Sequence, residues 1–127
     1  MTTQGTVLVI DDEESHRYTT RLMLQQWGFE VKEAATGYEG LRLAGELPAV
    51  ILLDLHLPDI SGIDLCLLLK ASPVTARIPI INVTAAYAGS EERSQALDAG
   101  ADGYLTRPVE PAHLLATMEA LLARRAA

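Results

Sequence analysis

The chain has 127 residues, of which 49% are hydrophobic and 5% aromatic, and this length allows one domain with its own core but not two. Its formal net charge of −7 disfavours nucleic acid as a partner through general electrostatics and is compatible with a divalent cation or a basic protein. The single cysteine, Cys66, excludes an intramolecular disulfide.

No apolar run is long enough to span a bilayer, and no basic stretch followed by a long apolar region opens the chain. Together with the single cysteine, these features favour a cytoplasmic protein without membrane attachment. Cys66 itself lies in a leucine-rich stretch, so we expect it to be a small buried hydrophobe.

Short apolar runs alternate with amphipathic stretches from the start of the chain. Residues 6–10 predict a strand covered on both faces, because the run is continuous rather than alternating. A helix follows, with apolar side chains on one face and Gly28 at its end. A second strand is expected at residues 29–31, a second helix at 36–46, a third strand at 50–53 and a third helix at 61–72.

The second half of the chain continues the alternation. Residues 78–83 predict a fourth strand, and Ser90 is the expected N-cap of a fourth helix that ends at Gly100. A fifth strand is expected at residues 104–105, and Pro111 suits the first turn of a fifth helix. That helix has one apolar stripe, formed by Leu114, Leu115, Met118, Leu121 and Leu122. Five strands alternating with five helices predict an α/β fold with a doubly wound parallel sheet.

Polar side chains follow the predicted strands. Asp11 and Asp12 come directly after the first strand, Asp54 after the third, Thr84 after the fourth and Arg107 soon after the fifth. In a doubly wound sheet these positions meet at the carboxyl edge, where functional groups gather. Clustered carboxylates favour Mg²⁺, and a hydroxyl and a guanidinium bind anionic oxygens. These are the groups needed to transfer a phosphoryl group to a carboxylate.

The order of these motifs resembles the receiver domain of bacterial two-component response regulators over nearly the whole chain. The acidic pair Asp11-Asp12 and the acceptor Asp54 match the family, as do Thr84-Ala85. Residues 57–62, Leu-Pro-Asp-Ile-Ser-Gly, resemble the Met-Pro-x-x-Asp-Gly loop of the family, and residues 100–105 match its approach to the fifth strand. The resemblance implies one receiver domain, residues 1–127, with a flavodoxin-like (βα)5 fold and strand order 2-1-3-4-5.

The resemblance also implies roles for the acidic residues. Asp54 is expected to be the nucleophile that forms an acyl phosphate. Asp12, Asp54 and the backbone carbonyl of His56 are expected to bind Mg²⁺, with Asp11 acting through water. The acidic neighbours Glu13 and Glu14 are interpreted as solvated charges at a helix start.

Further roles concern the phosphoryl oxygens and the switch. Thr84 and the backbone N–H of Ala85 are expected to bind those oxygens. Movement of Thr84 is expected to let Tyr104 turn inward and change the surface around the fourth helix, fifth strand and fifth helix. The family has Lys-Pro after the fifth strand, whereas this chain has Arg107-Pro108, and the family pattern implies a cis bond before Pro108.

The resemblance implies that a histidine kinase or a histidine phosphotransfer protein donates the phosphoryl group. The expected output is a downstream protein or effector domain that binds the switch surface, and a homodimer is compatible with it. Such a domain catalyses only its own phosphorylation and dephosphorylation and is not a conventional turnover enzyme.

Two other functions stay open. Arg107 is longer than lysine and forms a planar fork, so the domain is alternatively a pseudo-receiver that acts as a constitutive protein-interaction module. A Mg²⁺-dependent phosphohydrolase with an aspartyl nucleophile needs a second carboxylate two residues after Asp54. That position holds His56, which disfavours this class.

Overall fold

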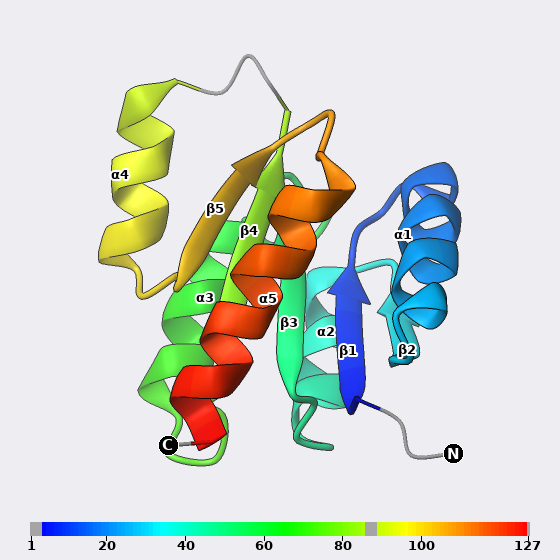
Figure 1. The fold of residues 1–127 in the computed structure, drawn as a ribbon. Helices are drawn as coiled ribbons and strands as arrows, with labels where there is room; N and C mark the ends of the chain where they lie inside the picture. The colour runs from blue at the N-terminus through cyan, green and yellow to red at the C-terminus, as the bar shows by residue number, and fades with distance from the viewer. Residues whose placement is uncertain (1–3, 86–88, 127) are drawn as a thin grey trace.

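The computed structural model describes residues 4–85 and 89–126. Five parallel strands form one sheet in the order β2-β1-β3-β4-β5 (Figure 1). The strands are β1 (Thr6–Ile10), β2 (Glu30–Ala34), β3 (Val50–Asp54), β4 (Ile80–Thr84) and β5 (Gly103–Thr106). The helices are α1 (Glu14–Gln26), α2 (Gly37–Ala44), α3 (Gly62–Ala71), α4 (Ser90–Asp98) and α5 (Pro111–Ala126). The predicted doubly wound, flavodoxin-like fold with strand order 2-1-3-4-5 is confirmed.

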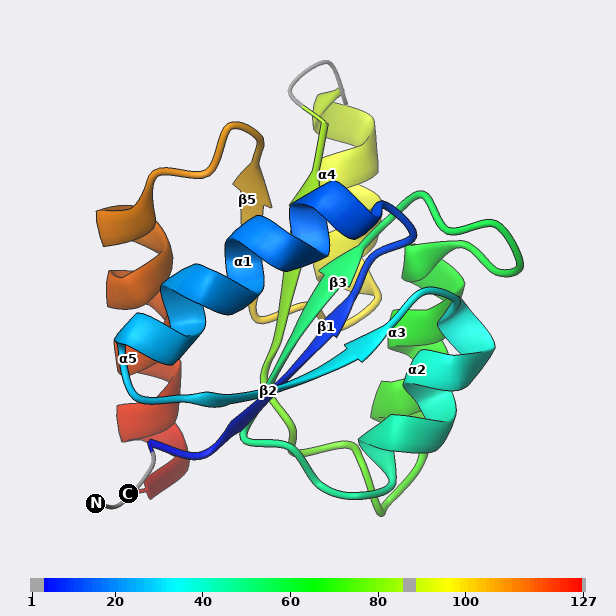
Figure 2. The ribbon, with the colours of Figure 1, turned by 90° about the vertical axis from the view of Figure 1, so that its right-hand side faces the viewer.

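Helices cover both faces of the sheet. Figure 2 shows α1 and α5 on one face and α2 and α3 on the other, while α4 lies near β5. Alternate residues of each strand therefore enter two separate apolar cores, because successive side chains point to opposite faces. Val7 and Val9 pack with Met118 of α5, whereas Leu8 and Ile10 pack on the side of α2 and α3.

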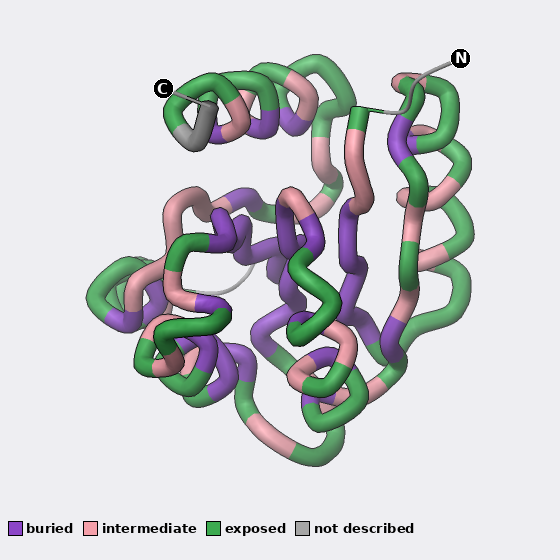
Figure 3. The backbone as a smooth tube through the Cα atoms, turned by 90° about the horizontal axis from the view of Figure 1, so that it is seen from below, coloured by how far each residue is buried: buried purple, intermediate pink, exposed green. Residues whose placement is uncertain are grey.

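The strands differ in burial according to their place in the sheet. β3 and β4 have a neighbouring strand on each side and are buried along their whole length, and most of their residues are apolar. Figure 3 shows the buried segments of the chain in the interior and the exposed ones on the outside. β2 is an edge strand in which exposed and half-buried residues alternate before the buried Ala34. The strand predicted at residues 29–31 is found at 30–34. Its second half was missed because Lys32 and Glu33 are polar and interrupt the apolar pattern.

Local signals fix most helix ends. Thr36 and Ser61 cap α2 and α3. The side-chain oxygen of each accepts from the backbone N–H of the residue three positions later, at 3.2 and 3.1 Å. Gly28 and Gly100 follow α1 and α4 with φ of 90° and 108°, a conformation that favours glycine. The predicted N-cap at Ser90 is wrong: Gly89 holds that position and Ser90 is already helical, without a side-chain cap.

Lys70 connects the end of α3 to two strands. Its Nζ donates to the carbonyl oxygens of Ala76 and Ile78, at 3.3 and 2.9 Å, and to Asp102 Oδ2 at 3.0 Å. The same Asp102 oxygen accepts from the backbone N–H of Ile80 at 2.9 Å. The start of β4 and the approach to β5 are thereby tied to one ammonium group. None of the described helices is long and apolar enough to cross a membrane.

We predict that Lys70→Met lowers the free energy of unfolding by about 1–3 kcal/mol, because it leaves Asp102 and two carbonyls without their shared donor. Urea unfolding measures this. The only other lysine, Lys32, pairs with Glu46 on the exposed surface, so Lys32→Met is the matched control and should give no change outside experimental error. Equal losses in the two variants would show that the Lys70 network adds nothing.

Candidate functional site

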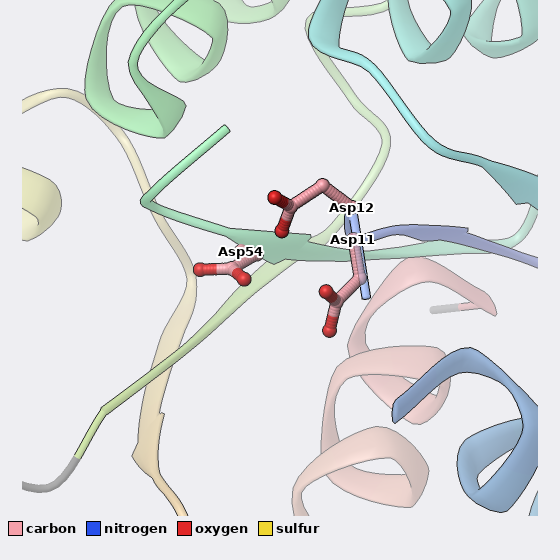
Figure 4. Close-up of side chains that lie close together, drawn as sticks. All are labelled: Asp11, Asp12 and Asp54. Atoms are coloured by element: carbon pink, nitrogen blue, oxygen red, sulfur yellow. The ribbon is translucent and has the colours of Figure 1, made fainter. Parts of the chain in front are cut away.

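Three aspartates meet at the carboxyl edge of the sheet. Asp11 and Asp12 follow β1, and Asp54 is the last residue of β3; the two strands are paired, with Ile10 beside Leu53. One carboxylate oxygen from each aspartate lies within 4.8 Å of the others (Figure 4). This oxygen-rich set suits Mg²⁺, which prefers carboxylate and carbonyl ligands and keeps several waters.

Backbone N–H groups orient two of these carboxylates. Asp11 and Asp54 are 3% and 8% exposed, whereas Asp12 is exposed. Asp11 Oδ1 accepts from the N–H of Glu13 at 2.9 Å, and Asp54 Oδ1 accepts from the N–H of His56 at 3.0 Å. One oxygen of each carboxylate is thus bound by the backbone two residues later in the chain. The second oxygen, Oδ2 in both residues, faces Arg107.

Arg107 supplies the positive charge nearest to the cluster. Its Nη2 donates to Asp11 Oδ2 at 2.5 Å, and its Nη1 lies 3.9 Å from Asp54 Oδ2 and 3.5 Å from the carbonyl oxygen of Val83. Its own N–H donates to the carbonyl oxygen of Thr84 at 2.7 Å. The Arg107–Pro108 peptide bond is cis. The arginine predicted at the rim therefore lies against the acidic cluster.

Burial is the main reason that the pKa of the Asp54 carboxyl is raised above its ordinary value. The N–H of His56 opposes that increase, Asp11 adds to it, and Arg107 opposes it. A carboxyl in this position gains from any further cation, because the cation favours its ionised form.

Thr84 and Tyr104 come from the two strands that follow β3 in the order of the sheet. Thr84 ends β4 and is buried, and its hydroxyl donates to Glu92 Oε1 at 3.4 Å. Ala85 follows it and is half-buried. Tyr104 of β5 pairs with Asn82, and the guanidinium carbon of Arg93 lies 5.8 Å from the centre of its ring. The Tyr104 hydroxyl is buried, with no hydrogen-bond partner in the described part of the chain.

The loop after β3 holds Asp54 in place through close backbone contacts. The N–H of Gly62 donates to the carbonyl oxygen of Leu55 at 2.8 Å. A Cβ on Gly62 would lie 2.5 Å from the carbonyl oxygen of Asp54, so only glycine allows α3 to begin this close to the strand. Asp59 accepts from the N–H groups of Gly37 and Tyr38 at 2.8 and 2.9 Å, which ties the loop to the start of α2.

Three contacts of this site were not predicted. Arg17 donates to the carbonyl oxygen of Asp11 at 2.6 Å, and His16 Nδ1 lies 3.3 Å from Asp11 Oδ2. The sequence signal for these two contacts is that His16 and Arg17 lie in the first turn of the helix that starts after the acidic pair. Glu92 lies in the first turn of α4, and its Oε2 lies 3.1 Å from Nε2 of His56.

Residues 7–119 match the family described as the response regulator receiver domain. The chain is 41% identical over 120 residues to the phosphate regulon transcriptional regulatory protein PhoB of Rhizobium meliloti, which covers 93% of this chain and 52% of that protein. It is 44% identical over 122 residues to the transcriptional regulatory protein KdpE of Mycobacterium tuberculosis, covering 95% of this chain and 52% of that protein. The chain thus spans about half the length of these curated relatives.

Solved structures agree with this match. The response regulator receiver domain protein (CheY-like) of Methanospirillum hungatei has a TM-score of 0.84 and 33% identity, with coverage of 98% of this chain and 97% of that chain. The response regulator receiver domain protein of Clostridium thermocellum has a TM-score of 0.86 and 28% identity, covering 94% and 95%. From the residues matched, the strand order and the acidic cluster at the strand ends, this chain belongs to the response regulator receiver domain family of two-component signal transduction.

Proposed function

We propose that Asp54 accepts a phosphoryl group and that the chain is a phosphorylation-controlled switch. The main support is the position of Asp54: a buried carboxylate at a strand end, beside Asp11 and Asp12 and within 3.9 Å of a guanidinium nitrogen of Arg107. A carboxylate buried among other carboxylates is typical of a nucleophile or a metal ligand.

In the proposed reaction an Asp54 oxygen attacks the phosphorus of a phosphohistidine on a histidine kinase or a phosphotransfer protein. The new P–O bond forms as the P–N bond breaks, and the electron pair of that bond stays on the imidazole nitrogen. The hydroxyl of Thr84 and the N–H of Ala85 donate to the phosphoryl oxygens, and Arg107 offsets their charge. Water later attacks the phosphorus of the acyl phosphate. The bond to the Asp54 oxygen breaks, inorganic phosphate leaves and the carboxylate is restored, so the domain catalyses both halves of its own cycle.

The oxygen donors of the site fit Mg²⁺. Asp12, Asp54 and the backbone carbonyl of His56 would hold the ion, with Asp11 acting through water. When bound, Mg²⁺ would neutralise charge on the transferring phosphoryl group.

The output of the proposed switch is the face formed by α4, β5 and α5. Tyr104 and Arg93 lie on this face, together with Glu110 and His113, around a hollow of about 530 Å³. We propose that a downstream protein or effector domain binds there, and that a homodimer would use the same face. That residues 1–127 form one receiver domain, and that the protein is cytoplasmic, stay predictions.

One observation favours the alternative function, a pseudo-receiver that binds a partner constitutively. Arg107 already pairs with Asp11 at 2.5 Å, which reduces carboxylate repulsion without any ligand. Acetyl phosphate with Mg²⁺ separates the candidates in mass spectrometry. A phosphoryl adduct supports the switch, no adduct supports the pseudo-receiver, and turnover of an added phosphoester supports the phosphohydrolase.

We predict that Asp54→Asn abolishes the adduct formed with acetyl phosphate and Mg²⁺, because the amide keeps the shape of the carboxylate but is no longer a nucleophile. Intact-protein mass spectrometry measures the adduct. Asp98→Asn, at an exposed position on α4, is the matched control and should be labelled like the wild type. Comparable labelling of Asp54→Asn would assign the acceptor elsewhere.

We predict that millimolar Mg²⁺ raises the melting temperature of the wild type, since a ligand that binds only the folded state stabilises it by about 1.4 kcal/mol at a tenfold excess over its Kd. Asp12→Ala should lose most of this shift. Glu14→Ala removes an exposed carboxylate from the adjacent helix start and should keep it. Equal shifts in all three proteins would remove Asp12 from the metal site.

We predict that beryllofluoride, a phosphoryl mimic, binds together with Mg²⁺ but shifts the amide signals of residues 102–122 only modestly. The Arg107 guanidinium already contacts Asp11, so it gains little binding energy from the added anion. The anion therefore changes the free-energy difference between the inactive and active states only slightly. Arg107→Lys should enlarge the response, whereas Arg77→Lys, at an exposed position, should not. A full response in the wild type that shrinks in Arg107→Lys contradicts this coupling.

A further inference from the structure

Glu92 in the first turn of α4 contacts two residues that flank the phosphoryl-acceptor position. Its Oε1 accepts from the Thr84 hydroxyl at 3.4 Å, and its Oε2 lies 3.1 Å from Nε2 of His56. Thr84 ends the strand next to that of Asp54, and His56 lies two residues after Asp54. The Glu92 carboxylate therefore joins the end of β4 to the loop that follows Asp54.

Helix α4 has little apolar surface with which to pack on the sheet. Ala96 is its only buried residue, and Leu97 is 41% exposed. Figure 1 shows the helix beside β5, at one edge of the sheet. The hydrophobic contribution of this helix is therefore small. The two polar contacts of Glu92 join its first turn to Thr84 and His56.

The Thr84 hydroxyl cannot serve two acceptors at once. A hydroxyl has one proton to donate, and in this structure Glu92 accepts it. Binding of phosphoryl oxygens by the same hydroxyl therefore requires that Glu92 give it up. A carboxylate also repels a dianionic phosphoryl group, and that repulsion is stronger in a partly buried site than in water. The side chain of Glu92 is 26% exposed.

We propose that Glu92 is a positioning residue that competes with the phosphoryl group for Thr84, so that phosphorylation of Asp54 releases the start of α4. This role rests on the proposed function of Asp54. The next residue, Arg93, lies over the ring of Tyr104, so movement of this helical turn changes that contact as well. The contact thus connects the acceptor to the face of α4, β5 and α5 through adjacent residues of one helix.

The simpler interpretation is that Glu92 only stabilises the helix start, as acidic residues in a first turn do. Glu91 provides the comparison. It lies in the same turn and carries the same charge, but it is exposed and contributes none of the bonds found among the described residues around Thr84 and His56. A helix-dipole effect is shared by the two residues, whereas competition for the Thr84 hydroxyl belongs to Glu92 alone.

The experiment compares wild type, Glu92→Gln and Glu91→Gln at saturating Mg²⁺. The dissociation constant of beryllofluoride is measured by amide NMR titration. Glu92→Gln should bind beryllofluoride about threefold to tenfold more tightly than the wild type, because a neutral amide is a weaker acceptor for Thr84 and does not repel the anion. Glu91→Gln should bind like the wild type.

Two further measurements separate competition from a general charge effect. Without ligand, Glu92→Gln should shift the amide signals of Thr84 and His56, and Glu91→Gln should not. In a Thr84→Val background, which lacks the hydroxyl, the gain from Glu92→Gln should shrink. A gain that stays undiminished there overturns competition for the hydroxyl.

The outcomes also distinguish this role from the proposed function. If the wild type binds beryllofluoride but the two glutamine variants have equal dissociation constants, Glu92 has no such role and Asp54 keeps its own. If beryllofluoride binds none of the three proteins, the acceptor function itself is overturned and the role of Glu92 with it.

Discussion

Repulsion among three carboxylates is the constraint around which this edge of the molecule is arranged. β1 and β3 are paired with Ile10 beside Leu53, so the residues that follow them lie close together. Two of the three carboxylates are buried, where water does little to screen their charges. Arg107 compensates part of this charge by contacting Asp11, and it reaches the site from the far end of the sheet order.

The apolar cores make that arrangement possible. Alternate residues of β1 and β3 enter opposite cores, so a slip of one residue in pairing would turn apolar side chains onto the wrong face. The resulting register of β1 and β3 places the aspartates at the ends of adjacent strands. Gly62 then fixes the loop after Asp54, and the Lys70–Asp102 contact holds the chain where it enters β5 and leads to Arg107.

The sequence predicts those parts that depend on local patterns. The buried middle strands have continuous apolar runs, and the aspartates at their ends converge once the sheet is parallel. The extent of β2 is less visible because an edge strand has polar side chains on its open side. The contact of His56 with Glu92 spans 36 positions, and it depends on side-chain directions that no local pattern encodes. Ser90 shows the same limit, since Gly89 holds the cap position.

The exchange of lysine for arginine bears on how such a domain carries information. A guanidinium has two outer nitrogens, and here one contacts Asp11 while the other lies near Asp54. A cation that is engaged before phosphorylation and after it contributes a small difference between the two states, and only that difference drives a switch. On the proposals made above, the larger difference lies at Thr84, whose hydroxyl must leave one acceptor for another. The signal would then travel from β4 into α4 through Glu92, with Arg107 keeping the acidic cluster together in both states.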